Sequence, residues 1–411
     1  MKKEKYRLEE VFKQTGFPEY TYAERDEYDL IFRSSLLSGG ALVYLYGDSK
    51  SGKTSMWKKY INEGEYIEVK ITNKMTVIDF YKELVDQIEP FIKTNFEETE
   101  ETEASVNLRG EGGLKAVFQA SAGTENKDTS LKTSRYERFA FPGLSLTTVS
   151  AVASEASKII ILEDFQVASY EFIKEVAHVL KAFADNMIKV IVVGTENKVP
   201  DLVKERLDIS GRIVTINLSH FKKDELGIII QKGEEKLNIR FNDEIKEFLI
   251  DESFERAYIL QGLCRYICII KGIGQTANQL YEIDDIDDAK RACKLLAGSV
   301  KGLYEPTAQN IAQAATKKNK FDTYRWILRV LRKDIIVGNE GVPAMLIATK
   351  IKNYVPDFTT ASIYPCLNVI PKKQTTEVFR YEDKKLYVND RLFLFYLKWN
   401  DDLWDNLNRD I

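Results

Sequence analysis

The sequence is understood most directly from residues 41–54, which read ALVYLYGDSKSGKT. The first six residues form an unbroken apolar run, which is typical of a strand buried on both faces of a parallel sheet. Gly47 and Gly52 then bracket a short polar loop, and a helix is expected over residues 55–62. A loop of this kind folds tightly enough to point successive backbone N–H groups at phosphate oxygens. The stretch therefore predicts a P-loop between a buried strand and a helix.

The side chains of this loop have separate predicted roles. Lys53 is placed to reach the β- and γ-phosphates of a nucleotide, and the Thr54 hydroxyl is placed to ligate Mg²⁺. A plain glycine turn between a strand and a helix would not explain Lys53. The predicted cofactors are ATP and Mg²⁺, and nucleotide contacts are expected along the whole loop: Gly47, Asp48, Ser49, Lys50, Ser51, Gly52, Lys53, Thr54 and Ser55.

A second apolar run, residues 159–162, ends in the acidic pair Glu163 and Asp164. A nucleotide hydrolase needs one carboxylate to hold Mg²⁺ and one group to orient a water against the γ-phosphate. We expect Glu163 in the magnesium shell, together with Thr54, and Asp164 on the water, although the two acids can exchange these roles. The alternative is that both are surface acids that close a strand.

Other polar residues stand where later strands begin or end. Thr195 and Asn197 follow the strand 188–194 and are candidates to sense the γ-phosphate, or they make ordinary turn hydrogen bonds. Arg206 and Arg212 precede the last strand and are candidates to contact a neighbouring subunit's nucleotide, because a guanidinium can stabilise charge on a transferring phosphoryl group. The alternative for each arginine is a structural role at the surface.

Strands and helices alternate over the first half of the chain, which predicts an α/β fold with a parallel sheet and helices on both faces. Five strands are expected, at 41–46, 66–71, 158–164, 188–194 and 213–218. The helices are expected at 26–38, 77–88, 143–156 and 170–185, and Pro90 is expected to end the second of them. Residues 94–139 are acidic and rich in Gly, Ser and Thr, so they predict a mobile insertion, optionally with a hairpin at 104–122.

The second half of the chain has mainly helical periodicity. A helical lid is expected from residue 223 to about 316, and the pattern after residue 321 is helix, turn, helix and then two strands, at 376–381 and 385–388. Helices followed by a two-stranded wing predict a winged helix. The expected domains are therefore a P-loop ATPase domain at 1–220, a helical lid at 221–316 and a winged helix at 317–411.

Composition limits the function classes. The chain has 411 residues, 44% of them apolar, enough for two or three cores, and no apolar run of membrane-spanning length. A cytoplasmic protein without membrane partners is expected. The net charge of −4 means that nucleic-acid binding must be argued from a local surface. Cys264, Cys268, Cys293 and Cys366 are interpreted as reduced buried thiols and not as metal ligands, because His178 and His220, the only histidines, lie far from them.

The order of these parts resembles a known family. The segments that carry the resemblance are 21–25 (TYAER), the P-loop, 161–165 (ILEDF), 193–195 (VGT), 210–212 (SGR), the helical lid and 393–399 (FLFYLKW). Together they resemble the prokaryotic AAA+ and STAND ATPases, close to the origin-recognition type and the archaeal ATPase group. The resemblance implies an adenine pocket near Tyr22 and Arg25, a lid over the nucleotide, and a second sensor near Arg265. Where the family usually has Asp and then Glu, this chain has Glu163 and Asp164, which predicts slow or partner-stimulated ATP hydrolysis.

Three functions follow as hypotheses. The first is a nucleotide-controlled switch that self-associates or signals to a separately encoded effector, and the family resemblance suggests a bacterial anti-phage system. The second is a DNA-binding ATPase of replication, transposition or regulation. Its reading helix, at about 359–370, contains no Lys or Arg, which disfavours it, although Lys372, Lys373, Lys384 and Lys385 lie nearby. The third is a nucleotide-binding protein that hydrolyses little and serves structurally.

Overall fold

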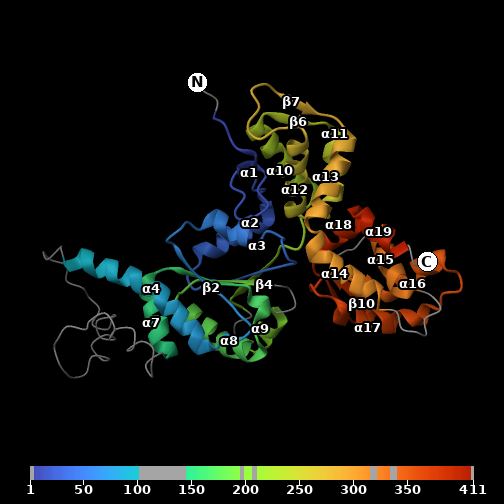
Figure 1. Cartoon of the computed structure of the whole chain (residues 1–411). Coiled ribbons are helices and arrows are strands. Elements are labelled where there is room, and N and C mark those ends of the chain that lie inside the picture. Colours follow the sequence, from blue (N-terminus) through green and yellow to red (C-terminus); the bar gives the residue numbers. More distant parts are fainter. Residues whose placement is uncertain are drawn as a thin grey trace, which may run out of the picture. The chain divides into compact units, whose positions relative to one another are not determined.

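The computed structural model describes residues 4–100, 145–194, 199–205, 211–314, 322–333 and 340–408 (Figure 1). The chain divides into two compact units. One consists of Arg25–Gly47 and Met56–Leu218, and the other of Met1–Glu24, Asp48–Ser55 and Ser219–Ile411. The P-loop residues from Asp48 onward thus belong to the same unit as the lid and the C-terminal segment.

The unit formed by Arg25–Gly47 and Met56–Leu218 contains a five-stranded sheet with the order β2-β3-β4-β1-β5, and all its paired strands are parallel. The strands are β1 (Leu42–Tyr46), β2 (Tyr66–Lys70), β3 (Ile159–Glu163), β4 (Val190–Gly194) and β5 (Ile213–Asn217). The central strands β1, β3 and β4 are the ones that read as unbroken apolar runs, because both of their faces are covered. The predicted α/β fold is confirmed.

Alternate side chains of the sheet enter two separate cores. Leu42 and Tyr44 of β1 pack with α4 (Val77–Glu100), α7 (Leu146–Ala156) and α8 (Tyr170–Asp185). Val43 and Leu45 pack on the other face with α2 (Asp26–Leu37) and with Met56 and Trp57 of α3 (Lys53–Tyr60). Helices therefore cover both faces of the sheet, as the strand period of two requires. A further helix, α9 (Val199–Glu205), packs against α8.

The prediction that Pro90 ends its helix is wrong, because α4 continues to Glu100. A proline removes one backbone hydrogen bond and crowds the preceding turn, yet the turns on either side keep their own bonds, so a helix can be bent at this point without ending. The first residues of the predicted insertion, 94–100, belong to this helix. The rest of the insertion and its hairpin at 104–122 lie outside the described residues.

The lid segment is mainly helical, and its buried residues share one core with those of the C-terminal segment. It contains α10 (Lys223–Leu237), α11 (Asp243–Glu252), α12 (Ala257–Ile270), α13 (Ile286–Ser299) and α14 (Lys301–Ala312), and α1 (Leu8–Val11) packs against α10 and α12. Two short parallel strands, β6 (Ile239–Phe241) and β7 (Tyr281–Ile283), join it and were not predicted. Cys264, Cys268 and Cys293 are buried in this core, and burial raises the pKa of each thiol.

The C-terminal segment combines helices with a small antiparallel sheet of order β8-β10-β9. Its elements are α15 (Thr323–Lys333), β8 (Val342–Pro343), α16 (Ala344–Tyr354), η4 (Thr360–Ser362), α17 (Ile363–Lys373), β9 (Phe379–Glu382), β10 (Lys385–Val388), α18 (Arg391–Trp399) and α19 (Asp401–Asn408). The expected reading helix extends beyond residue 370 to Lys373, so it does contain basic residues, in its last turn. Its classification as a winged helix, and the three-domain division, stay predictions.

Within the described ranges, no helix has both the length and the apolar character needed to cross a membrane.

Candidate nucleotide site

The P-loop backbone adopts conformations that depend on its glycines. Gly47 has φ 141° and Gly52 has φ 90°, and residues with a side chain rarely adopt either value. Lys50, between them, has φ 60°, a left-handed conformation. Helix α3 begins at Lys53, directly after the second glycine. The loop thus combines a tight turn with a helix N-terminus, the arrangement that presents backbone N–H groups to an anion.

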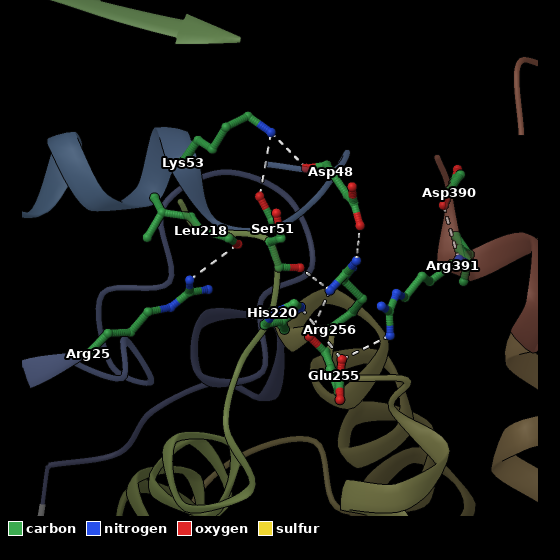
Figure 2. Close-up of polar contacts among 12 residues, drawn as sticks. Arg25, Asp48, Ser51, Lys53, Leu218, His220, Glu255, Arg256, Asp390 and Arg391 are labelled. Atoms are coloured by element: carbon green, nitrogen blue, oxygen red, sulfur yellow. Dashed lines mark hydrogen bonds and ion pairs between the residues drawn. The ribbon is translucent and has the colours of Figure 1, made fainter. Parts of the chain in front are cut away.

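The Lys53 ammonium is held within the loop. Its Nζ donates to the backbone oxygen of Asp48 at 2.7 Å and lies 3.5 Å from Oγ of Ser51, which is fully buried (Figure 2). Both partners are neutral, so phosphate oxygens can replace them with a gain in electrostatic energy. The Thr54 hydroxyl is on an exposed residue of the first helical turn. The residues of the loop therefore fit a nucleotide polyphosphate.

The Asp48 side chain forms an ion pair with Arg256, the residue that precedes α12 (Figure 2). The Arg256 side chain is only 2% exposed, and its guanidinium also donates to the backbone oxygen of Ser219. The resemblance had suggested Arg265 as the lid arginine near the nucleotide, but the arginine that contacts the P-loop lies nine positions earlier. Phe254 and Glu255, with φ 51° and 60°, make the turn that places it there.

The Lys50 side chain contacts the C-terminal segment. Its Nζ lies 3.5 Å from Oδ2 of Asp390 and 5.0 Å from the ring centre of Tyr258. Asp390 caps α18 by accepting the N–H of Leu392 at 3.0 Å, and it accepts the hydroxyl of Tyr304 at 2.5 Å. Burial and the nearby Asp390 carboxylate raise the pKa of Tyr304, so this phenol stays a donor. Asp390 thus contacts the P-loop while it caps α18.

A second ion pair joins the C-terminal segment to the lid. Arg391, which is buried, pairs with Glu255 at 2.9 Å (Figure 2). His220 Nδ1 lies 3.8 Å from the same Glu255 carboxylate. Burial lowers the pKa of His220, and Arg391 and Arg256 add to this, while Glu255 opposes it. Asp390, Arg391, Glu255 and Arg256 were all missed by sequence reasoning, because no local spacing links them to the P-loop.

The acidic residues belong to the sheet unit. Glu163 is the last residue of β3, is 7% exposed, and accepts a hydrogen bond from Nε1 of Trp57 at 2.6 Å. A buried carboxylate at the carboxyl end of a central strand fits the chemistry of a magnesium ligand. That Glu163 and Thr54 hold the ion together stays a prediction. The hydrogen bond from Trp57 was not foreseen.

Asp164 is exposed and has a left-handed backbone, with φ 59°. Nε2 of Gln166 donates to its Oδ1 at 3.2 Å. An exposed carboxylate beside the buried Glu163 fits the role of contacting water better than that of a metal ligand. The proposed division of roles between the two acids, with its alternative, stays a prediction.

Of the remaining catalytic candidates, the structure describes only Arg212. Thr195, Asn197 and Arg206 lie outside the described residues. Arg212 forms a surface ion pair with Asp185 at the end of α8. It precedes Ile213, which pairs with Leu42 at the start of β1, so Arg212 lies at the sheet edge opposite the end that leads into Gly47. Such a position agrees with a contact to a neighbouring molecule's nucleotide, which stays a prediction.

Tyr22 and Arg25, the residues of the predicted adenine pocket, belong to different units, and each makes a hydrogen bond within its own unit. In one unit, Tyr22 is buried and its backbone oxygen accepts Nζ of Lys232 at 2.7 Å. In the other, Arg25 is buried and donates to the backbone oxygen of Leu218 at 3.3 Å (Figure 2). Their contact with a base stays a prediction.

Comparison with known proteins adds evidence at the level of the fold. No family model and no curated protein matches the sequence. The Walker-type ATPase PABY2304 of Pyrococcus abyssi is 17% identical, with 94% of this chain and 99% of that chain covered and a TM-score of 0.51. The ADP form of the Aeropyrum pernix ORC2 protein is 13% identical, with 97% and 98% covered, but its TM-score of 0.46 is too low to support an argument. The chain therefore has the fold of a Walker-type P-loop ATPase, as the resemblance to the AAA+ and STAND group implied.

Proposed function

We propose that the protein binds ATP with Mg²⁺ at the P-loop, hydrolyses it slowly, and uses the nucleotide state as a switch. The observation that supports the switch is the pair of contacts made by the P-loop's own charged side chains. Asp48 pairs with Arg256 of the lid, and Lys50 pairs with Asp390 at the start of α18. Any nucleotide that changes the charges around this loop therefore acts on both segments.

The phosphate chemistry rests on three groups. Lys53 exchanges its neutral partners for β- and γ-phosphate oxygens, and the backbone N–H groups between Gly47 and Gly52 bind the same anion. Mg²⁺, held by Thr54 and Glu163, would neutralise charge on the phosphates. Asp164 accepts a proton from, or orients, the attacking water. Its side chain is one methylene shorter than the usual Glu, which accounts for slow turnover.

The switch follows from competition between anions. Bound phosphates add several negative charges close to Lys50, whose ammonium is otherwise shared with the Asp390 carboxylate. The phosphates attract Lys50 and repel Asp390, so nucleotide binding weakens this ion pair. The ion pair between Arg391 and Glu255 continues to tie the start of α18 to the lid. The start of α18 is thereby loosened and becomes available to a partner.

The proposed output is self-association or contact with a separate effector protein, and Arg206 and Arg212 are the residues proposed to reach a neighbouring molecule's nucleotide. A role in an anti-phage system stays a prediction from the family resemblance. DNA binding through the reading helix remains the alternative function.

The experiment measures phosphate release and solution mass for the same samples. Wild-type protein, Lys53→Ala and Arg212→Ala are compared without nucleotide, with ADP and with a non-hydrolysable ATP analogue, each with Mg²⁺. We expect slow phosphate release and an ATP-specific rise in mass, both lost in Lys53→Ala, with Arg212→Ala affecting hydrolysis only in the assembled form. Wild-type protein that neither binds ATP nor releases phosphate contradicts the proposal. A protein that hydrolyses ATP but stays monomeric contradicts only the self-association.

A further inference from the structure

A basic hollow of about 560 Å³ is lined by residues of α13 and of the C-terminal helices α15, α18 and α19. The hollow is lined by more cations than carboxylates. The cations are Lys290, Arg291 and Lys294 of α13, Arg332 of α15 and Lys398 of α18, and the carboxylates are Asp287 and Asp401. The side chains that line the hollow therefore carry a net positive charge.

The ion pairs in the hollow leave a positive surplus. Asp401 is shared by Lys294, at 2.9 Å, and Arg332, at 3.4 Å. Asp287 pairs with Lys290 at 3.0 Å, and Lys398 pairs with Glu252 at 2.6 Å. Arg291 is exposed, and its guanidinium has no hydrogen-bond or ion-pair partner in the part of the chain that the structure describes. One carboxylate that serves two cations neutralises neither of them fully, so the hollow attracts anions.

Helix α15 extends this positive surface. Its buried face carries Ile327, Leu328 and Leu331, and its other face carries Arg325, Arg329 and Arg332 at spacings of four and three residues. Asp322 pairs with Arg325 at 2.7 Å, so Arg329 and Arg332 supply the positive charge of this face. These spacings place the three guanidinium groups along one side of the helix, and the last of them is the arginine that lines the hollow. The basic face and the hollow therefore share Arg332.

Aromatic rings lie within the same face. Trp326 stacks on Tyr354 of α16, with ring centres 5.3 Å apart and an angle of 24° between the planes. The Arg329 guanidinium lies 4.9 Å from the Trp326 ring centre. Tyr354 is 50% exposed, so its ring is accessible from solvent. Arginines alternating with accessible aromatic rings are typical of surfaces that bind nucleic-acid backbones and bases.

We propose that the α13–α15 surface, formed by Lys290, Arg291, Lys294, Arg329 and Arg332, binds the phosphodiester backbone of a nucleic acid. Guanidinium groups recognise phosphate through two parallel hydrogen bonds, and an accessible ring offers a face on which a base can stack. The charge of the C-terminal segment agrees with this, because residues 317–411 contain 17 Lys and Arg against 12 Asp and Glu in a chain whose net charge is −4.

This surface is separate from the reading helix of the predicted winged helix. Helix α17 carries basic residues only in its last turn, at Lys372 and Lys373. A protein that contacts nucleic acid through α13 and α15 therefore binds by charge and stacking, with little reading of base edges. The chemistry is shared by single-stranded DNA, duplex DNA and RNA, and the accessible aromatic ring favours a single strand.

The test uses the full chain and fluorescence anisotropy with labelled oligonucleotides of about 20 nucleotides, as single-stranded DNA, duplex DNA and RNA, from about 50 to about 200 mM salt. The test variant is Lys290→Gln/Arg291→Gln, which removes two exposed charges of α13. The matched control is Lys372→Gln/Lys373→Gln, which makes the same chemical change on α17. Thermal unfolding of both variants confirms that they are folded.

The proposal predicts salt-dependent binding and a smaller salt dependence in the α13 variant. Each lost phosphate contact lowers the slope of log K against log salt by about 0.7 for a single strand and about 0.9 for a duplex, so two contacts lower it by about 1.4 or 1.8. The control variant keeps the wild-type slope. Absence of binding to all three nucleic acids overturns the proposal, as does a slope lost only in the α17 variant. A polyglutamate of equal charge that binds as tightly as the oligonucleotides assigns the surface to an acidic protein instead.

Discussion

Replacing Asp390 with Asn should tighten the binding of ATP. Asn keeps the shape of the side chain and remains a good N-cap for α18 through its one oxygen, and its amide nitrogen can donate to the oxygen of the Tyr304 hydroxyl. The substitution removes the charge that faces Lys50. At the 3.5 Å between Lys50 Nζ and Asp390 Oδ2, the gross attraction at an effective dielectric constant of about 20 is about 5 kcal/mol. Solvent reaches both groups, since their side chains are 31% and 14% exposed, so the net contribution is about 1 kcal/mol.

If nucleotide binding must break this ion pair, its loss lowers the Kd for ATP about fivefold, which corresponds to about 1 kcal/mol. The assay is isothermal titration calorimetry with a non-hydrolysable ATP analogue and Mg²⁺, at low and high salt, because salt screens the pair and should reduce the difference. Asp383→Asn, at the turn between β9 and β10, is the matched control and should bind like the wild type. An unchanged or weaker affinity of Asp390→Asn would refute the reasoning.

Three further predictions concern single side chains. Trp57→Phe removes the Nε1 donor that bonds to the buried Glu163 carboxylate, so it should lower the free energy of unfolding by about 1.5–3 kcal/mol in urea titrations. An unchanged urea midpoint would show that this hydrogen bond does not stabilise the fold. Because burial lowers the pKa of His220, the stability that its neutral form contributes is present above pH about 6.5 and falls as the pH drops toward the lower folded pKa. Wild type should therefore lose more stability than His220→Gln between pH about 7.5 and about 5.5, and parallel losses would contradict the shift. Burial raises the pKa of Cys268 to about 12, so alkylation by iodoacetamide should proceed only as fast as the protein opens, and rapid labelling of the native protein would contradict that burial.

Much of the sheet unit was predictable because its signals are local. The runs at 41–46, 159–162 and 188–194 are apolar on both faces, which only a central parallel strand requires, and each corresponds to a central strand of the sheet. The P-loop was placed correctly between β1 and α3 for the same reason. Pro90 misled the prediction because a proline disturbs one turn of a helix without always ending it, and α4 continues to Glu100.

The contacts around the P-loop were not predictable from local pattern. Asp48 and Arg256 are separated by 208 residues, and Trp57 and Glu163 by 106, so each contact exists only once the whole chain has folded. The resemblance indicated a lid arginine near Arg265, and the structure shows Arg256 in contact with the P-loop. Family order indicates a region of the chain and not the turn that directs a side chain. Strands β6 and β7 are three residues long, too short for an alternating pattern to be recognised.

The central claim is that ATP binding at the P-loop releases the start of α18, and amide hydrogen exchange tests it directly. Exchange is followed by mass spectrometry in peptides that cover residues 47–56 and 388–399, without nucleotide, with ADP, and with a non-hydrolysable ATP analogue. The account predicts that the ATP analogue slows exchange in the P-loop peptide and speeds it in the peptide from the start of α18, and that Lys53→Ala shows neither change. A P-loop that becomes protected while the start of α18 keeps or gains protection would contradict the claim.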